Sequence, residues 1–405
     1  MATIAILLSV LACQDGSDGK QGPQGPPAPA PAPLPTPTKV SPLENAPQLV
    51  VEILELSGAS GAGGEFAVGD TIGLRYRMEK RDGTPWLLEE MTSGIALVSG
   101  PTFSYQRVIP TLADVLTQSI ANADGTFSYT LPPLPAVYAA PFNDTPSFGA
   151  NDGELTGQAL LGGTYTVGLS ISWNYSVEGE AFQNVGEATR DFVVGLTQGG
   201  TIEPREVTKI DNCNQCHVEL RAHQDRHRNL TMCLMCHTVG AEDGNDPSVA
   251  GGTPGVTIDS RNLFHKIHNA AHLPSVLGVA SFANGLRNYG ATPVPLEYLA
   301  ADNSVRDFSS IRLGVFPNEA SPMLRDFGYS GLTAAAQSLE DEMLTGVTSC
   351  FVCHGDPDGS GPLTAPSQGD LIEVQPTRAA CDGCHDDVDY ANTYISNLQI
   401  ITLTP

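Results

Sequence analysis

Cys213-Asn-Gln-Cys216-His217 is the stretch that decides the fold of this chain, because its pattern returns three times further along. Two cysteines separated by two residues and followed at once by a histidine are the attachment signal of a c-type haem. The thiols add to the two vinyl groups of one porphyrin, and the histidine reaches the iron from one face. The sequence therefore predicts four covalently bound haem c groups, each with its iron bound by the histidine of its motif. The other three copies are Cys233-Leu-Met-Cys236-His237, Cys350-Phe-Val-Cys353-His354 and Cys381-Asp-Gly-Cys384-His385.

Other uses of paired cysteines fit this chain poorly. A structural zinc site does not need a histidine directly after every cysteine pair. A thioredoxin-type redox motif occurs once, within a βαβ unit. Eight of the nine cysteines lie in the four motifs, and the ninth is Cys13. No cysteines remain for a disulfide framework, so haem attachment accounts for the cysteine content beyond Cys13.

The histidines are confined to the same part of the chain, since the first 216 residues contain none. Nine are present, and four of them close the motifs. Four irons with two imidazoles each would take eight of the nine, so we expect most of the remaining five to be distal iron ligands. His223, His265 and His268 are the preferred ligands, and His272 is placed ahead of His227 for the fourth position.

Three of these spare histidines lie in one predicted helix, over residues 262–272. Spacings of three and four residues put His265, His268 and His272 on neighbouring parts of one helix face. Pro274 is expected to end the helix. Such a helix can supply ligands to two or three adjacent haems.

The supply of histidines also bears on catalysis. A haem enzyme that acts on a small molecule needs an iron with an open sixth position. Multihaem nitrite reductases mark such an iron with a lysine in place of the motif histidine, and no Cys-x-x-Cys-Lys occurs in the chain. Electron transfer is therefore the expected activity rather than enzyme catalysis, with terminal metal-reductase activity left open. A multihaem reductase of a small oxyanion is the alternative, and it requires one iron without a distal histidine. An adhesive lipoprotein with incidental haems is disfavoured by four covalent cofactors.

The amino-terminal segment is typical of a lipoprotein. Residues 1–12 form a short apolar run that ends in a small residue before Cys13, which is the predicted lipidated first residue. An ordinary cleaved signal peptide is the alternative. Twelve residues are too few for a membrane-spanning helix, so we expect membrane attachment only through the lipid. Residues 13–44 are rich in glycine and proline and are predicted to form an extended tether.

Residues 45–200 are predicted to form an all-β domain, either a sandwich or a split Greek-key barrel. Apolar and polar residues alternate with period two over residues 71–78 and 165–175, which indicates half-buried strands. This region contains no histidine or cysteine and therefore no catalytic constellation. Its expected role is spacing, docking or covering haem edges. Further strands are predicted at residues 48–56, 92–99, 126–131 and 190–195.

Residues 201–405 are predicted to form a tetrahaem cytochrome c domain of short helical and irregular segments, because four porphyrins supply much of its hydrophobic core. Residues 275–345 are expected to be an irregular insertion with a short helix at 334–343. Residues 307–317 are interpreted either as packing against a haem or as a surface loop. The net charge of −25 excludes nucleic acid as a partner and favours positive surfaces, cationic metals and basic redox proteins.

Several segments, taken in order, resemble a known family. Residues 212–223, 233–238, 264–268 and 376–390 are similar to segments of the outer-membrane multihaem cytochromes of the OmcA/MtrC type, made by metal-respiring bacteria. The likeness extends over residues 165–390. It implies that the histidine six residues after the first motif histidine, here His223, is a distal ligand. It also implies that the helix with His265 and His268 supplies a pair of ligands.

The resemblance implies extracellular electron transfer by a lipid-anchored protein on the outer surface of the outer membrane. Electrons would arrive from an outer-membrane conduit or another multihaem cytochrome. They would leave to metal oxides, soluble metals, shuttles or other cytochromes. A homo-oligomer, or a filament whose haems run between protomers, is the alternative assembly.

The chain departs from the family pattern in three respects. The family members carry ten haems in two five-haem domains, whereas this sequence predicts one domain with four haems. It stops about where a fifth motif would be expected, and both a smaller relative and a truncated product remain open. The β region has no cysteine, so a thiol-gated switch does not carry over.

Overall fold

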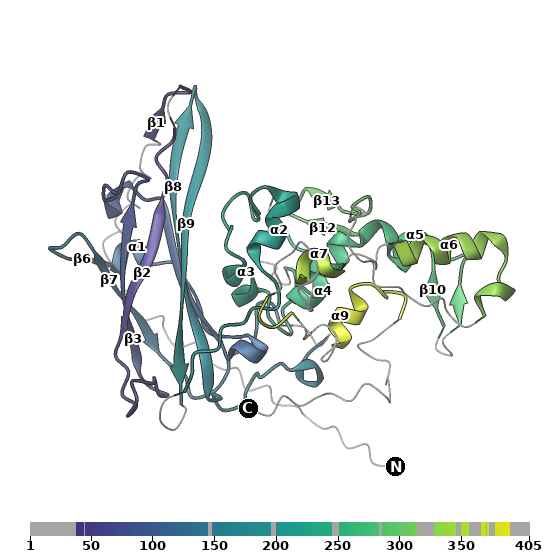
Figure 1. The fold of residues 1–405 in the computed structure, drawn as a ribbon, viewed down its shortest axis with the longest axis horizontal. Helices are drawn as coiled ribbons and strands as arrows, with labels where there is room; N and C mark the ends of the chain where they lie inside the picture. Colours follow the sequence, from purple (N-terminus) through teal and green to yellow (C-terminus); the bar gives the residue numbers. More distant parts are fainter. Residues whose placement is uncertain are drawn as a thin grey trace, which may run out of the picture. The chain divides into compact units, whose positions relative to one another are not determined.

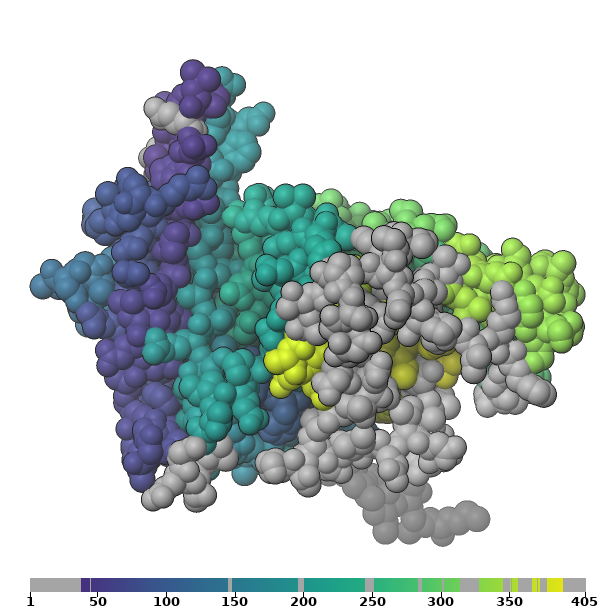
Figure 2. Space-filling model, viewed as in Figure 1, coloured from purple at the N-terminus to yellow at the C-terminus, as the bar shows by residue number. Residues whose placement is uncertain are grey.

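The structure is a computed structural model of the full chain (Figure 1). The predicted leader, Cys13, the tether up to residue 37 and residues 389–405 lie outside the part that it describes. Figure 2 shows the same view in space-filling form, with residues 38–195 in purple to teal and the later residues in teal to yellow. The described residues are 38–43, 45–144, 148–195, 200–244, 251–282, 286–300, 302–313, 328–345, 350–355, 366–369, 371 and 377–388.

Two β sheets form the amino-terminal region. In the first sheet, β1, β8, β4 and β5 follow one another, and β9 pairs with β8. The second sheet has the order β2-β3-β7-β6 and is antiparallel throughout. The strands of the first sheet are β1 (Thr38–Val40), β4 (Ser93–Gly100), β5 (Gln106–Leu112), β8 (Gly163–Val177) and β9 (Glu180–Val194). Those of the second are β2 (Val50–Ser57), β3 (Thr71–Glu79), β6 (Ile120–Ala121) and β7 (Phe127–Pro133).

The two sheets share one hydrophobic core, which makes this region a sandwich. In β3, Ile72 and Tyr76 are completely buried and alternate with partly exposed residues, as period two requires. Trp86 and Trp173 meet in this core with ring centroids 4.8 Å apart. Burial of such aromatic side chains is the main stabilising contribution to this part of the molecule.

The long hairpin of β8 and β9 differs from its predicted form. The two strands pair from Gly163↔Val194 to Val177↔Glu180, with a two-residue turn at Glu178 and Gly179. Both turn residues have positive φ, at 50° and 93°, as a tight hairpin turn of this kind requires. The prediction of a strand at 190–195 was therefore right in place and far too short. The first half of β9 is rich in polar residues and has no clear alternation, so its period gave no strand signal.

Burial of β8 also exceeds the prediction of a half-buried strand. Residues 164–173 are all buried, so both faces of this part are covered. A Cβ atom added to Gly168 would lie 2.3 Å from the sulfur of Met232 and 3.0 Å from that of Met235. Small residues therefore alternate with the core side chains of β8 because a helix packs directly on its second face.

Short helices follow the sandwich, as predicted. They are α2 (Ile210–His217), α3 (Leu230–Cys236), α4 (Ser260–His268), α5 (Pro274–Leu277), α6 (Ala334–Thr345), α7 (Cys350–His354) and α9 (Arg378–Asp382). Two small antiparallel pairs also occur, β10 (Ala280–Ser281) with β11 (Arg287–Asn288) and β12 (Glu297–Leu299) with β13 (Val305–Asp307). In the described part of the chain, no helix combines the length and apolar character needed to cross a membrane.

The predicted helix over residues 262–272 was wrong at both ends. It begins at Ser260, because the side chain of Asp259 accepts a hydrogen bond from the Arg261 amide. It ends at His268, and a separate 3₁₀ turn covers Ala270–His272. Pro274 does not terminate this helix but starts α5, a first-turn position that proline tolerates because its missing N–H is not needed there.

The described parts of the segment 275–345 contain more secondary structure than predicted. The short helix expected at 334–343 is confirmed as α6. The two small antiparallel pairs were not predicted, because their strands are only two or three residues long. Phe308 packs against Tyr298 with ring centroids 5.6 Å apart, so this part of 307–317 contacts protein. Residues 314–317 lie outside the described residues.

Candidate haem-attachment and iron-ligand site

Each predicted attachment motif lies on a short helix or at its end. Helices α2, α3 and α7 each contain both cysteines of a motif. Positions three residues apart lie on the same helix face, so the two thiols of a motif lie side by side. In the fourth motif α9 contains only Cys381, and the turn continues because the His385 amide donates to the Cys381 carbonyl at 2.9 Å.

Buried asparagines connect the motif helices to one another. Asn212 is 3% exposed and donates to the Cys353 carbonyl at 2.9 Å, which joins the first motif to the third. Asn262 is completely buried and donates to the Ala379 carbonyl at 3.1 Å and to the Asp382 carboxylate at 2.6 Å. This second contact joins α4, which carries two of the spare histidines, to the fourth motif.

Three pairs of histidine rings lie close together, with nearly equal distances between their centroids. Two imidazoles that bind one metal from opposite sides, each through a bond of about 2 Å, have ring centroids about 6 Å apart. The structure therefore brings together three motif histidines and three spare histidines at the spacing that a shared iron requires. The centroid distances are 6.0 Å for His217 and His268, 5.9 Å for His223 and His237, and 6.1 Å for His265 and His354.

Hydrogen bonds fix the orientation of several of these rings. The Nδ1 atom of His237 lies 2.8 Å from the Ile258 carbonyl oxygen, and that of His268 lies 2.8 Å from the Phe264 carbonyl oxygen. The Nδ1 atom of His354 lies 3.1 Å from the carbonyl oxygen of Val207. A carbonyl only accepts, so Nδ1 must donate and Nε2 keeps its lone pair. That is the arrangement of a metal-binding imidazole with its second nitrogen held by the protein.

Burial keeps the key imidazoles neutral. It lowers the pKa of His237 to about 4, and it does the same for His265. Both rings are therefore uncharged near neutral pH, which is the form that binds a metal. Burial also raises the thiol pKa of Cys233, Cys353 and Cys384 to about 12.

The segment that follows the fourth motif is hydrogen-bonded to the segment that follows His272, the remaining buried histidine. His272 is 2% exposed, and its Nδ1 lies 2.9 Å from the Glu342 carbonyl oxygen. Asp386, next to His385, accepts hydrogen bonds from the amide and hydroxyl of Ser275, three residues after His272. These bonds bring the segments of His272 and His385 together.

Carboxylates surround the fourth motif. Asp387 is fully buried and accepts hydrogen bonds from Ser281 at 2.6 Å and from Arg287 at 3.1 Å. Asp382 forms an ion pair with Lys266 at 3.3 Å. Burial raises the pKa of Asp386. Three carboxyl groups therefore lie around this motif, with Lys266 and Arg287 as basic partners of two of them.

His227 differs from the other spare histidines. Its Nδ1 lies 2.6 Å from a carboxylate oxygen of Glu187, a residue of β9 whose side chain is 3% exposed. Its ring is 5.7 Å from that of His223 and nearly perpendicular to it. Glu187 escaped the sequence analysis because its part of β9 carried no strand signal.

The sandwich contacts the second motif directly. The hydroxyl of Ser99, in β4, donates to the Met235 carbonyl at 2.8 Å, and Met235 is completely buried.

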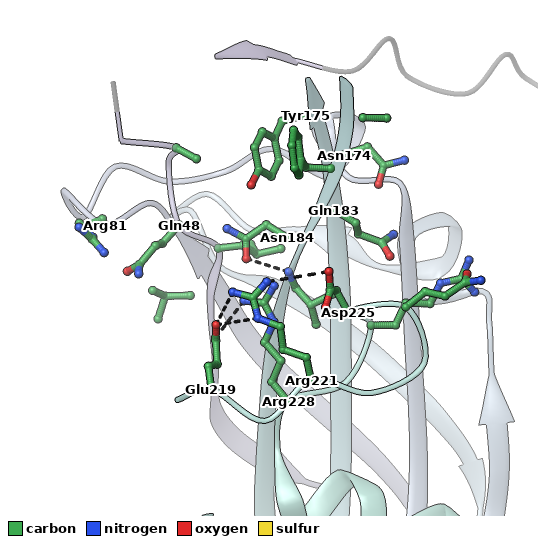
Figure 3. A pocket seen from close by; sticks show the side chains of 18 of the residues that line it. Gln48, Arg81, Asn174, Tyr175, Gln183, Asn184, Glu219, Arg221, Asp225 and Arg228 are labelled. Atoms are coloured by element: carbon green, nitrogen blue, oxygen red, sulfur yellow. Dashed lines mark hydrogen bonds and ion pairs between the residues drawn. The ribbon is translucent and has the colours of Figure 1, made fainter. Parts of the chain in front are cut away.

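A cavity of about 800 Å³ opens beside the segment that follows the first motif (Figure 3). Within its lining, Glu219 pairs with Arg221 and Arg228 and thereby braces the segment that carries His223.

Paired cysteines on short helices, together with histidine rings about 6 Å apart, are the arrangement expected of a multihaem c-type cytochrome. Residues 205–403 match the family model "Outer membrane cytochrome MtrC/MtrF-like, domains II/IV". The match over these residues confirms the resemblance to the outer-membrane multihaem cytochromes that the sequence shows.

Two further comparisons complete this picture. Among solved structures, the chain is similar to the crystal structure of the outer membrane decaheme cytochrome OmcA, with a TM-score of 0.49 and 15% sequence identity. The alignment covers 85% of this chain and 44% of that one, so this chain spans less than half the length of that protein. No curated protein sequence matches the chain.

Proposed function

We propose that this protein is a cell-surface tetrahaem cytochrome that relays electrons through bis-histidine haems to an extracellular acceptor. The observation that carries the proposal is the set of three histidine pairs with centroids 5.9–6.1 Å apart. Each pair joins a motif histidine to a spare histidine from elsewhere in the chain. Membership of the outer-membrane cytochrome family supports the same function.

The geometry supports one assignment of ligands to the four haems. The first haem would be held by Cys213 and Cys216 between His217 and His268, and the second by Cys233 and Cys236 between His237 and His223. The third would be held by Cys350 and Cys353 between His354 and His265. The fourth would be held by Cys381 and Cys384 between His385 and His272, the two whose segments Asp386 and Ser275 join. A bound haem would supply reversible one-electron exchange at its iron.

In this assignment the ligand sets would lie close together. His265 and His268 are three residues apart on α4, so neighbouring positions of one helix serve the first and third haems. Asn212 joins the first and third motifs, and Asn262 joins α4 to the fourth. His223 links the second set to the segment that follows the first motif. Each haem would therefore have a neighbour attached to an adjacent segment, as an electron relay requires.

Two different classes of function fit these observations less well. A small-oxyanion reductase needs an open iron, but three irons would be closed by ring pairs, and the segment of His272 is hydrogen-bonded to that of the fourth motif. A purely adhesive lipoprotein would not need rings oriented by carbonyl groups. A filament subunit remains the second candidate of the same chemistry. His227 is the one spare histidine that the four pairs leave over.

The location and partners belong to the same proposal. Lipidation at Cys13 would anchor the protein at the outer surface of the outer membrane. An outer-membrane conduit or another multihaem cytochrome would deliver electrons. Metal oxides, soluble metals, shuttles or other cytochromes would receive them. The net charge of −25 supports attraction to cationic metals and positive mineral surfaces, more strongly at low salt.

Reoxidation of the reduced holoprotein tests this function. The haems are reduced anaerobically, excess reductant is removed, and ferric citrate or a ferric oxide suspension is added while the haem absorption bands are recorded. We expect all four haems to return to the ferric state, because each can pass electrons to a neighbour. Reduced protein without an acceptor is the control. Haems that stay reduced with both acceptors would contradict the proposal.

A further inference from the structure

The segment between α2 and α3 has an unusual backbone. Val218, His223, Gln224 and Asp225 have φ values of 61°, 52°, 61° and 67°. Side chains other than glycine rarely adopt this region, and for a β-branched residue such as Val218 it is a true outlier. Strained backbone of this kind persists only where the surrounding structure holds it in place, and it concentrates at functional sites.

A single buried carboxylate holds the carboxyl-terminal end of this segment. Glu187 accepts hydrogen bonds from Nδ1 of His227 at 2.6 Å, from the Arg228 amide at 2.7 Å and from the Asn229 amide at 2.8 Å. Its side chain is 3% exposed, so water competes poorly for these donors. Bonds to a charged acceptor are the strong ones, and here three converge on one group.

The carboxylate of Glu187 lies between the segment that carries His223 and the helix that leads into His237, the two histidines of the second pair. On one side, the ring of His227 contacts that of His223, which faces His237 at 5.9 Å. On the other side, Asn229 caps α3, the helix that carries Cys233 and Cys236 and leads into His237. The carboxylate therefore reaches both imidazoles of the pair through intermediates that touch it directly.

We infer that Glu187 is a positioning residue of the sandwich that holds the strained segment so that His223 and His237 face each other across the second haem. His227, which is hydrogen-bonded to Glu187 and in ring contact with His223, then transmits this support to His223 and is not an iron ligand. This inference rests on the proposed function. It gives the sandwich a specific role toward one haem and gives the ninth histidine a role.

Two substitutions at His227 separate a linking role from a ligand role. His227→Asn keeps a donor near the position of Nδ1 and removes the metal-binding ring nitrogen, whereas His227→Ala removes both. In the oxidised holoprotein we expect His227→Asn to retain the four low-spin EPR signals of the parent. His227→Ala should shift the g values of one signal and leave all four irons low-spin. An iron of the reduced His227→Asn protein that binds carbon monoxide would overturn the inference, because His227 would then be a ligand.

Substitution of Glu187 tests the anchor itself. Glu187→Gln removes the charge and cannot accept three hydrogen bonds as the carboxylate does. We expect it to shift the g values of the same single signal and to raise the midpoint potential of that haem. Glu180→Gln is the matched control, because Glu180 lies exposed at the start of the same strand. Four signals and potentials identical to those of the parent in Glu187→Gln would overturn the inference.

The two proposals fail in different ways. If the proposed function is wrong, the parent protein itself shows fewer than four low-spin haems. If only the positioning role is wrong, the parent is intact and the Glu187 and His227 variants match it. If the Glu187→Gln protein does not acquire its haems, the two His227 variants test the inference alone, because both keep the buried carboxylate of Glu187.

Discussion

Replacing His268 with alanine is expected to create one iron that binds carbon monoxide in the reduced protein. The ring of His268 faces that of His217 at 6.0 Å, and no other ring contacts His217 in the described part of the chain. Loss of His268 therefore leaves the first iron with its motif histidine alone. The carbon monoxide difference spectrum should rise from no binding to about one quarter of total haem.

His227→Ala is the control for that substitution. It removes an imidazole of the same region, but one bonded to Glu187 instead of facing a motif histidine. We expect its reduced spectrum to be unaffected by carbon monoxide. Equal binding in the two variants, or none in His268→Ala, would show that the assigned pairing of the first haem is wrong.

Replacing Trp173 with alanine should produce the largest loss of stability. Trp173 is 1% exposed in the sandwich core, 4.8 Å from the ring of Trp86 and 4.9 Å from that of Tyr175. Truncation of a fully buried aromatic side chain removes its apolar burial and leaves a cavity, at a cost of about 3–5 kcal/mol. Chemical unfolding followed by tryptophan or tyrosine fluorescence measures the change in the free energy of unfolding.

Phe182→Ala offers a comparison on the same hairpin. Phe182 is 42% exposed and stacks on Tyr175 at 5.4 Å. Its truncation exposes little new surface and removes one ring contact, so we expect a loss of about 1 kcal/mol. Similar losses for the two variants would mean that the sandwich core does not depend on Trp173 as its burial implies.

The sequence was sufficient where a pattern repeats or has a clear period. The four motifs predict the haem-binding cysteines and histidines because haem attachment needs that spacing. The strand over 165–175 follows from its alternation and is confirmed within β8. The family resemblance was also readable, because several motifs occur together in order.

The sequence was insufficient where a residue acts through a partner that is distant in the chain. Glu187 lies 40 positions from His227, and its surroundings in β9 show no period that would mark it. The division of the predicted ligand helix at Asn269 depends on packing, since His272 turns toward the Glu342 carbonyl. Pairing of histidines across the fold likewise requires three-dimensional positions, because a count of residues cannot supply it.

Glycine gave a weaker clue to the contact between the sandwich and the helices. The small residues of β8 alternate with core side chains, and the sequence predicted a solvent-facing side for them. Gly168 instead lies under Met232 and Met235 of α3, with no room for a Cβ atom. A buried second face and an exposed face of small residues look alike in sequence, so the structure was needed to distinguish them.

Low-temperature EPR of the oxidised holoprotein, with total haem determined on the same sample, tests the central claim most directly. Two imidazoles on every iron predict four low-spin ferric signals per polypeptide and no high-spin component. A high-spin signal that amounts to one haem per polypeptide would contradict the account. One iron would then be open, and a reductase of a small molecule would replace the electron relay as the function.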